Sequence, residues 1–389
     1  MSFLSIPPDV INEIIFDLIN TKTILGLCLV CKQINEMVHK RSWTQKFSFR
    51  IPGKHNTCYD RTVDFLDKIR FSWSLKNIQF NGLVMGGPIN DKIYNYPIPH
   101  NTDGRLITPN KLIFKECVFR DSTKLINYMP FFDLSHLSVL KLDCINCYNY
   151  RYTMDKISTM CRNLRSLSII FKNHDNFNFR NIYPFSIDNA LNKLCISYIL
   201  EKPSFFGHLH NSWNVNTNNF LHITFLKLSG IDLSGVEIEK FTALQKLSII
   251  NCVKLNLPLD SISLTNLTII ESHYSIHYRE YYWMLDNSFL PNLQKLKLEI
   301  YSQNTIDFEK TRISEKMKLL SIKFQDSGIC RIRGITELKK LTNLEFLEIK
   351  HVNDKAYNLS KSPNVPIFSL AAEFPDIKMC YISTKITLY

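Results

Sequence analysis

Two pairs of cysteines have the C-x-x-C spacing that metal-binding and thiol-redox sites use. They are Cys28 with Cys31 and Cys144 with Cys147. A zinc site shared by both pairs would need them close together, but the pairs lie far apart in the sequence. Because free cysteine also packs well as a small apolar side chain, we interpret both pairs as packing residues and predict no metal site.

Two histidines, His273 and His277, have the spacing that puts two metal ligands on one helical face. A zinc protease of the H-E-x-x-H type also needs a glutamate directly after the first histidine, and Tyr274 stands there. The sequence has no glycine-rich phosphate loop and no G-x-S-x-G nucleophile motif, and it contains only 11 Gly in 389 residues. We therefore predict a chain that is not an enzyme and uses no cofactor.

The composition is that of a chain that buries a large core. Of the 389 residues, 45% are hydrophobic and 21% are charged, which excludes a mainly disordered protein. The 11 cysteines are an odd number in no regular framework, so we expect reduced thiols and a cytoplasmic or nuclear protein. The first residues lack a secretory signal pattern and no apolar run is long enough to span a bilayer, so we expect no membrane partner.

The net charge of +12, from 47 Lys and Arg against 35 Asp and Glu, has two interpretations. A basic protein can bind nucleic acid or another polyanion. Alternatively, the chain is rich in Asn, Lys, Ile, Tyr and Phe, which A/T-rich codons encode in some protists and large DNA viruses, so that lysine is partly a codon effect. The charge therefore indicates a partner only where it gathers on one face.

A short phrase with apolar residues at positions 1, 4 and 6 recurs from residue 75 onward; Leu244, Leu247 and Ile249 form one clear copy. The copies follow one another at steps of roughly 27 residues, which lies within the range of leucine-rich repeats. The phrase resembles that family, and we predict a solenoid of about twelve irregular repeats over residues 75–389. Clear copies begin at Leu137, Leu164, Leu191, Ile223, Leu244, Leu264, Leu293, Met317 and Leu344, and weaker copies begin at Leu75, Pro109 and Ile377.

This pattern predicts an α/β fold in which each repeat adds one short strand to a parallel sheet. Positions 4 and 6 point into the core, whereas positions 3, 5 and 7 point to the concave, solvent-facing side. Leucine-rich repeats often carry Asn or Cys three places after the last apolar position, where the side chain hydrogen-bonds the turn, and Cys117 and Cys252 occupy that place. We expect loops at residues 81–108, 171–190, 201–220 and 271–290.

The start of the chain has a different, helical pattern. Residues 5–9 indicate a helix start, because proline falls in the first turn and the Asp9 carboxylate lies near the positive end of the helix dipole. Apolar residues then recur at helical spacing, and a break near Asn20 separates one or two further short helices. We predict a three-helix domain over residues 1–45 and a linker or helical cap over residues 46–74.

Residues 3–45 resemble the F-box motif, and an F-box followed by leucine-rich repeats is a familiar arrangement in that family. Ile6 stands where the family usually has leucine, Asp9 where it has glutamate, and Ile34 where it has tryptophan. The residues that carry the resemblance are Ile6, Pro7, Asp9, Val10, Ile11, Ile14, Ile15, Leu18, Leu25, Val30, Cys31, Lys32 and Trp43.

The resemblance implies the substrate-recognition subunit of an SCF-type ubiquitin ligase, with no catalytic residue of its own. Its F-box would dock on a Skp-family adaptor, and through it on a cullin, while the repeats hold the target protein. The implied adaptor contacts are Ile6, Pro7, Val10, Ile14, Leu18, Leu25 and Val30. Two alternatives stay open: some of these side chains form the small core of the three helices, or the helices only cap the solenoid of an interaction scaffold unrelated to ubiquitin.

Lysines outnumber acidic residues at positions 3, 5 and 7. They are Lys111, Lys115, Lys141, Lys193, Lys227, Lys246, Lys295, Lys297, Lys323 and Lys350, against Asp143, Glu299 and Glu348. Like charges in register repel unless an anion lies across them, so we predict an acidic or phosphorylated protein substrate. Codon-driven lysine on a solvated strand is the alternative, and the few aromatic residues among the lysines disfavour nucleic acid. The predicted substrate-binding residues are Phe225, Lys227, Lys246, Lys295, Lys297 and Phe346.

Overall fold

The structure is a computed structural model, and the chain divides in it into two compact units. The first comprises Met1–Lys172 with Phe185–Ala190, and the second comprises Asn173–Pro184 with Leu191–Tyr389. The described residues are 10, 43–50, 75–81, 84–85, 107–119, 132–145, 157, 159–173, 191–200, 222–233, 236, 238–252, 263–270, 290–300, 305–309, 312–325, 330–351, 377, 379–382 and 386–388.

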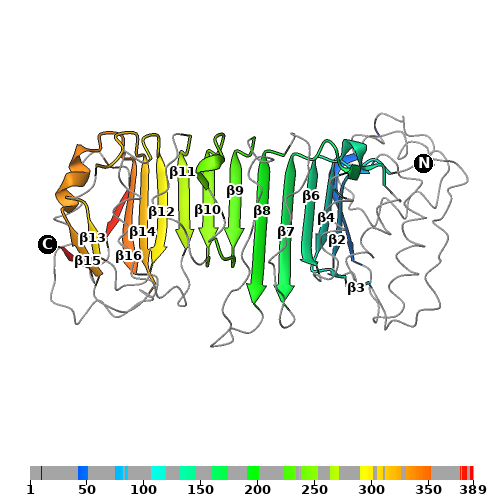
Figure 1. Ribbon diagram of the computed structural model, residues 1–389, viewed down its shortest axis with the longest axis horizontal. Helices are drawn as coiled ribbons and strands as arrows, with labels where there is room; N and C mark the ends of the chain where they lie inside the picture. The colour runs from blue at the N-terminus through cyan, green and yellow to red at the C-terminus, as the bar shows by residue number, and fades with distance from the viewer. Residues whose placement is uncertain are drawn as a thin grey trace, which may run out of the picture. The chain divides into compact units, whose positions relative to one another are not determined.

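The first unit contains a parallel sheet in which each strand pairs with the next one along the repeats (Figure 1). Its strands are β1 (Trp43–Arg50), β2 (Leu75–Asn81), β4 (Lys111–Lys115), β6 (Val139–Ile145) and β7 (Ser166–Asn173). Two shorter strands, β3 (Val84–Met85) and β5 (Val118–Phe119), pair with each other, and β5 also pairs with β6. A 3-10 helix, η5 (Leu134–His136), precedes β6.

The second unit repeats this design, with its strands side by side and pointing the same way (Figure 1). The strands are β8 (Lys193–Leu200), β9 (Phe225–Ser229), β10 (Lys246–Ile250), β11 (Asn266–Ile270), β12 (Lys295–Ile300), β14 (Leu319–Phe324), β16 (Phe346–His351) and β17 (Met379–Ile382). A second parallel sheet has the order β13 (Thr305–Asp307), β15 (Cys330–Arg333) and β18 (Ile386–Leu388). Two 3-10 helices, η7 (Ile238–Lys240) and η9 (Ile335–Lys340), connect strands.

The strand register confirms the repeat positions predicted from the sequence. Leu247 pairs with Leu267, and Ile249 with Ile269, so position 4 meets position 4 and position 6 meets position 6. The residues at positions 4 and 6 of β2, β4, β6–β12, β14 and β16 are at most 3% exposed. In the first unit the position-6 rings of Phe80 and Phe114 stack with their centres 5.3 Å apart. Both units are therefore parallel strand arrays of the solenoid type, with one apolar row per inward position.

Backbone hydrogen bonds also repeat from copy to copy just before each strand. The carbonyl oxygen of Thr224, at position 2, accepts from the amides of Gln245 and Lys246, both at 2.9 Å. The carbonyl of Gln245 then accepts from Thr265 at 2.9 Å and Asn266 at 3.0 Å. These bonds satisfy polar groups that packing against the core would otherwise leave without water, so they favour one register between repeats.

The strand ends adopt a left-handed turn at position 8, at Glu116, Gly230 and Asn251, with φ values of 54°, 68° and 51°. The next residue in two of these copies is cysteine. The thiol of Cys117 donates to the Lys115 carbonyl at 3.4 Å, and that of Cys252 donates to the Ile250 carbonyl at 3.4 Å. The expected role of both cysteines in bonding the turn is therefore confirmed.

One strand was not predicted. Residues 46–74 were expected to form a linker or helical cap, but β1 pairs with β2 and aligns Phe47 with Ile78 and Phe49 with Phe80. The strand starts at Trp43, a residue that was predicted to belong to the F-box-like domain. Two expected loops are also shorter: β7 continues to Asn173, and β3 lies inside the expected loop 81–108. The parallel array thus begins before residue 75.

The predicted N-terminal helices lie almost wholly outside the described residues. Val10 is described; it is helical and 40% exposed. The other predicted adaptor contacts, Ile6, Pro7, Ile14, Leu18, Leu25 and Val30, lie outside. In the part of the chain that is described, no helix is long and apolar enough to cross a membrane.

Candidate functional site

The surface that best fits a binding role is the outward side of the main sheet in the second unit. We define the open face as positions 3, 5 and 7 of β8–β12, β14 and β16. Its side chains are exposed or half-buried, with the exception of Ser321, which is 3% exposed. All six predicted substrate-binding residues lie on it: Lys246, Lys295 and Lys297 are exposed, while Phe225, Lys227 and Phe346 are half-buried. Lys111, Lys115 and Lys141 belong to the first unit and are not part of this face.

Parallel pairing arranges the open face in rows that run across the strands, with neighbours in a row about 4.8 Å apart. The position-3 row is Lys193, Phe225, Lys246, Asn266, Lys295, Leu319 and Phe346. The position-5 row is Cys195, Lys227, Ser248, Thr268, Lys297, Ser321 and Glu348.

The register brings some predicted residues together and separates others. Phe225 and Lys246 are direct cross-strand partners, and Lys295 and Lys297 are two residues apart on β12. Asn266 alone separates Lys246 from Lys295 in the position-3 row. Phe225, Lys227, Lys246, Lys295 and Lys297 therefore form one patch over β9–β12. Leu319 separates Phe346 from this patch in the position-3 row.

Phe225 is already engaged on one side of its ring. The Nζ atom of Lys193, on the neighbouring strand, lies 4.5 Å from the centre of the ring. A cation at this distance is attracted by the negative face of the aromatic ring. The contact between Lys193 and Phe225 therefore marks the β8 end of the patch.

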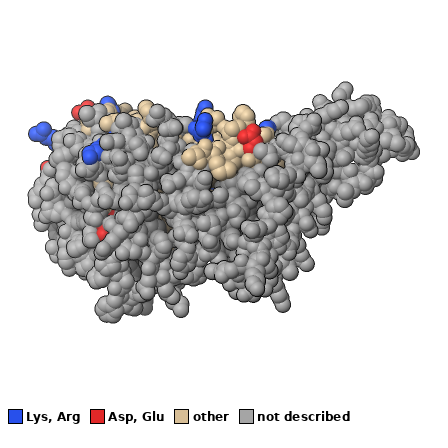
Figure 2. All heavy atoms as spheres, turned by 45° about the vertical axis from the view of Figure 1, so that its right-hand side comes forward, with Lys and Arg blue, Asp and Glu red and all other residues tan. Residues whose placement is uncertain are grey.

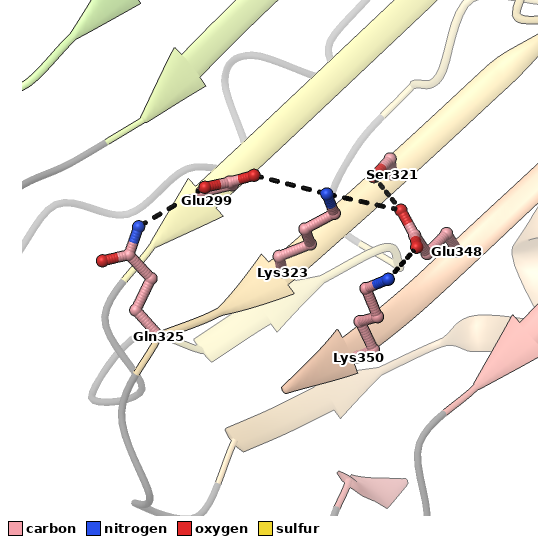
Figure 3. A network of polar contacts seen from close by, with 6 residues as sticks. All are labelled: Glu299, Ser321, Lys323, Gln325, Glu348 and Lys350. Carbon is pink, nitrogen blue, oxygen red and sulfur yellow. Dashed lines mark hydrogen bonds and ion pairs between the residues drawn. The ribbon is translucent and has the colours of Figure 1, made fainter. Parts of the chain in front are cut away.

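At the other end of the open face, lysines and glutamates compensate one another (Figure 3). Lys323 lies between two carboxylates, 3.3 Å from Glu299 and 4.0 Å from Glu348. Glu348 also accepts from Ser321 at 2.6 Å and pairs with Lys350 at 2.5 Å, and Gln325 donates to Glu299 at 3.5 Å. These residues come from β12, β14 and β16, with Gln325 directly after β14, so the network ties three repeats together.

The network also determines the protonation of Glu348. Burial would raise the pKa of this carboxyl, but hydrogen bonds from Lys350 and Ser321 and the charges of Lys323 and Lys350 outweigh it. The pKa of Glu348 therefore lies below its usual value of 4.5. The carboxylate stays ionised and occupied by its own lysines at neutral pH.

The lysines of β9–β12 differ from those of the network, because they have no acidic partner among the described residues. Within the described chain, Lys227, Lys246, Lys295 and Lys297 take part in no ion pair. The residues between them in the rows, Asn266, Ser248 and Thr268, are uncharged. Figure 2 shows side chains of both signs of charge among the described residues in view. The lysines of β9–β12 are instead a local excess of one sign. It creates positive potential that an anionic partner can neutralise.

Sequence reasoning missed the uncharged residues between these lysines and the compensated network beside them. Both follow from aligning neighbouring copies position by position, which puts Lys323 between Glu299 and Glu348. It also missed an asparagine that precedes position 1 in several copies. The side-chain amides of Asn163 and Asn343 donate to the carbonyls of Ser135 at 2.6 Å and Glu315 at 2.8 Å. These bonds join two of the copies to the copy before them.

The candidate metal ligands do not form a site where the structure describes them. Among the described residues, no three His, Cys, Asp or Glu side chains are grouped to hold a metal ion. Cys28, Cys31, Cys147, His273 and His277 lie outside those residues. No protein-family model matches the sequence, and a search of curated proteins finds no match.

Proposed function

We propose that this chain is a non-catalytic receptor, the substrate-recognition subunit of an SCF-type ubiquitin ligase. The repeat array would hold the target protein on the open face, and residues 3–45 would dock on a Skp-family adaptor and through it on a cullin. The observation that carries the receptor part is the set of lysines on β9–β12 that have no acidic partner in the described chain. Holding a target beside an adaptor needs a binding face and no reactive group.

Support for the ligase part comes from the sequence. Residues 3–45 resemble the F-box motif, and an adaptor groove is filled by apolar side chains on an exposed helical face. Val10, one of the implied contacts, is helical and 40% exposed, which leaves its side chain accessible.

The test is co-purification from cells. Tagged full-length chain should recover adaptor and cullin, and a Pro7→Ala, Leu18→Ala double variant should lose both while still capturing the target. Ile199→Ala is the matched control, because it removes an apolar side chain that is 43% exposed on β8. Recovery of adaptor and cullin by the double variant as well as by the control would contradict the ligase proposal.

One observation favours a second candidate, an interaction scaffold whose N-terminal helices cap the array. β1 begins at Trp43, inside the F-box-like range, and pairs directly with β2. Residues 1–42 therefore directly precede the first strand of the sheet in the sequence. Terminal repeats need cover for their apolar core. If capping is the only role, the Pro7→Ala, Leu18→Ala variant should lower the urea midpoint of unfolding, and neither variant nor wild type should recover cullin.

A further inference from the structure

We infer that the open face binds an acidic peptide segment in a polyproline II conformation, which crosses β10–β16 with two carboxylates three residues apart, followed after three more residues by an apolar side chain. The inference deepens the proposed function, and it rests on that proposal in taking the open face as the site of capture. It names the conformation and the spacing that the partner must have.

A peptide cannot bind here by adding a strand. Each of β9, β10, β11, β12 and β14 has a parallel partner on both sides, so its backbone groups are already used in the sheet. Strand addition needs a free edge. A partner on this part of the face is therefore held by side chains, and the lysine ammonium groups are its strongest donors.

The spacing of the lysines selects a conformation. Lys246 and Lys295 share the position-3 row with β11 between them, which separates their backbone positions by about 9.6 Å. In polyproline II, residues three apart point the same way and lie about 9.3 Å apart. In a β-strand, side chains on one side lie about 6.7 or 13.4 Å apart, which does not match this row. The position-3 row thus fits a partner with carboxylates at i and i+3.

The position-3 row also indicates which residue follows the two carboxylates in the partner. Leu319 and Phe346 follow Lys295, and both are half-buried, so part of each side chain is accessible. Phe346 lies two strands beyond Lys295, about 9.6 Å away, which is again three residues of polyproline II. Glu348 beside it in the position-5 row keeps its own lysines and repels a further carboxylate. The third anchor of the partner is therefore apolar.

The position-5 row adds positive charge but does not require a different spacing of the carboxylates in the peptide. Lys297 is two residues from Lys295 on β12, about 6.7 Å along the strand. It can therefore approach the same carboxylate from the position-5 side. Asn266, between the two lysines of the position-3 row, offers an amide to the peptide backbone and no competing charge. The inferred motif is acidic, two residues, acidic, two residues, then aliphatic or aromatic.

The experiment measures binding of three fluorescein-labelled peptides to the full-length chain by fluorescence anisotropy at low salt. Each peptide has two aspartates and one leucine on a Pro/Ser background; the aspartates are separated by one, two or three residues. We expect the peptide with two intervening residues to bind at least about three-fold more tightly than the others. Lys246→Gln and Lys295→Gln should each weaken it about two- to five-fold, as for other exposed charge pairs. Lys318→Gln is the control, because this exposed lysine is at position 2 and outside the open face.

Three results would overturn the inference: equal affinity for the three spacings, no binding of any of them, or tighter binding of a single-stranded oligouridylate, which would assign the face to nucleic acid. The outcome is separable from that of the ligase proposal. Lys246→Gln and Lys295→Gln leave residues 3–45 intact, so recovery of adaptor and cullin should not change in these variants. Loss of cullin recovery by the Pro7→Ala, Leu18→Ala variant should likewise leave the peptide affinities unchanged.

Discussion

Gly230 lies directly against the backbone of Tyr198, and a Cβ atom on Gly230 would lie only 2.3 Å from the Tyr198 carbonyl oxygen. Both residues occupy position 8 of neighbouring repeats, just after the outward-facing positions. The main chains of the two repeats can approach here because glycine has no side chain. Gly230 also has a φ of 68°, in the left-handed region that other residues avoid.

Replacing Gly230 with alanine should therefore destabilise the second unit. Left-handed backbone alone costs about 1–2 kcal/mol for a residue with a Cβ, and the contact with a rigid carbonyl adds to that. Urea unfolding of the full chain should show a lower midpoint. Asn251→Gly is the control: Asn251 has the same position and a φ of 51°, and glycine relieves strain there, so its midpoint should change little. Equal midpoints for Gly230→Ala and wild type would contradict the close approach.

Leu247 tests the core rows. Its side chain is 2% exposed at position 4 of β10, between Leu226 and Leu267 of the adjacent strands. Leu247→Ala should cost about 2–5 kcal/mol of unfolding free energy, because it removes apolar contacts and leaves a cavity. Ser248→Ala, one residue later on the open face, should have a much smaller effect in the same urea titration. A Leu247→Ala midpoint as high as that of Ser248→Ala would refute the register.

Glu348 should make stability depend on acid pH. Its pKa is lowered in the folded chain, so folding favours the ionised form. This contribution is complete above the usual carboxyl pKa of 4.5 and is lost as pH falls through the lower folded value. Glu348→Gln should reduce stability at pH 7 and also reduce the loss between pH 5 and pH 3. Thermal unfolding across that range measures both, with the exposed Glu315→Gln as control.

Two thiols with raised pKa values, the buried Cys161 and the half-buried Cys252, should resist alkylation in the native chain. Burial raises the pKa of Cys161 to about 12. It raises that of Cys252 to about 11, although backbone hydrogen bonds oppose this. The thiolate is the nucleophile, so iodoacetamide at pH 8 should label both slowly by mass spectrometry, and rapidly after addition of urea. Cys195, half-buried on the open face, is the reference thiol and should react faster in the native state. Native labelling of Cys161 at the rate of Cys195 would contradict its burial.

The inward rows could be predicted from the sequence because burial permits few residue types. Apolar residues at positions 4 and 6 recur in each clear copy, and the spacing of two identifies a strand face. β1 escaped detection because the register shifts between Trp43 and Lys46. Trp43 pairs with the position-1 residue Leu75, but it lies four residues before Phe47 instead of three, so the spacing of positions 1, 4 and 6 is broken in the sequence. Phe47 and Phe49 nevertheless align with Ile78 and Phe80 at positions 4 and 6.

The outward rows were predictable only in part. Membership of the open face follows from position, so Lys227, Lys246 and Lys295 were placed correctly on it. Which charges neutralise one another depends on which repeats are neighbours in the sheet, and a single phrase does not contain that information. Lys323 counts as a free cation in a list of lysines, yet β12 and β16 put Glu299 and Glu348 beside it. The effective patch is therefore narrower than the composition of positions 3, 5 and 7 implied.

Charge reversal at β12 tests whether this narrower patch captures the target. Lys295→Glu with Lys297→Glu puts two negative charges in the centre of the patch, where no ion-pair network among the described residues compensates them. Binding of an acidic target should therefore fall at least about ten-fold. Lys316→Glu with Lys318→Glu changes the net charge equally at exposed residues before β14 and should have little effect. Capture by the wild type should also weaken as salt rises, because exposed charges are screened over about 8 Å at physiological ionic strength. Adaptor binding through apolar side chains should respond much less to salt. Undiminished capture by the Lys295, Lys297 variant would assign recognition to other parts of the chain and leave these lysines as solvated residues.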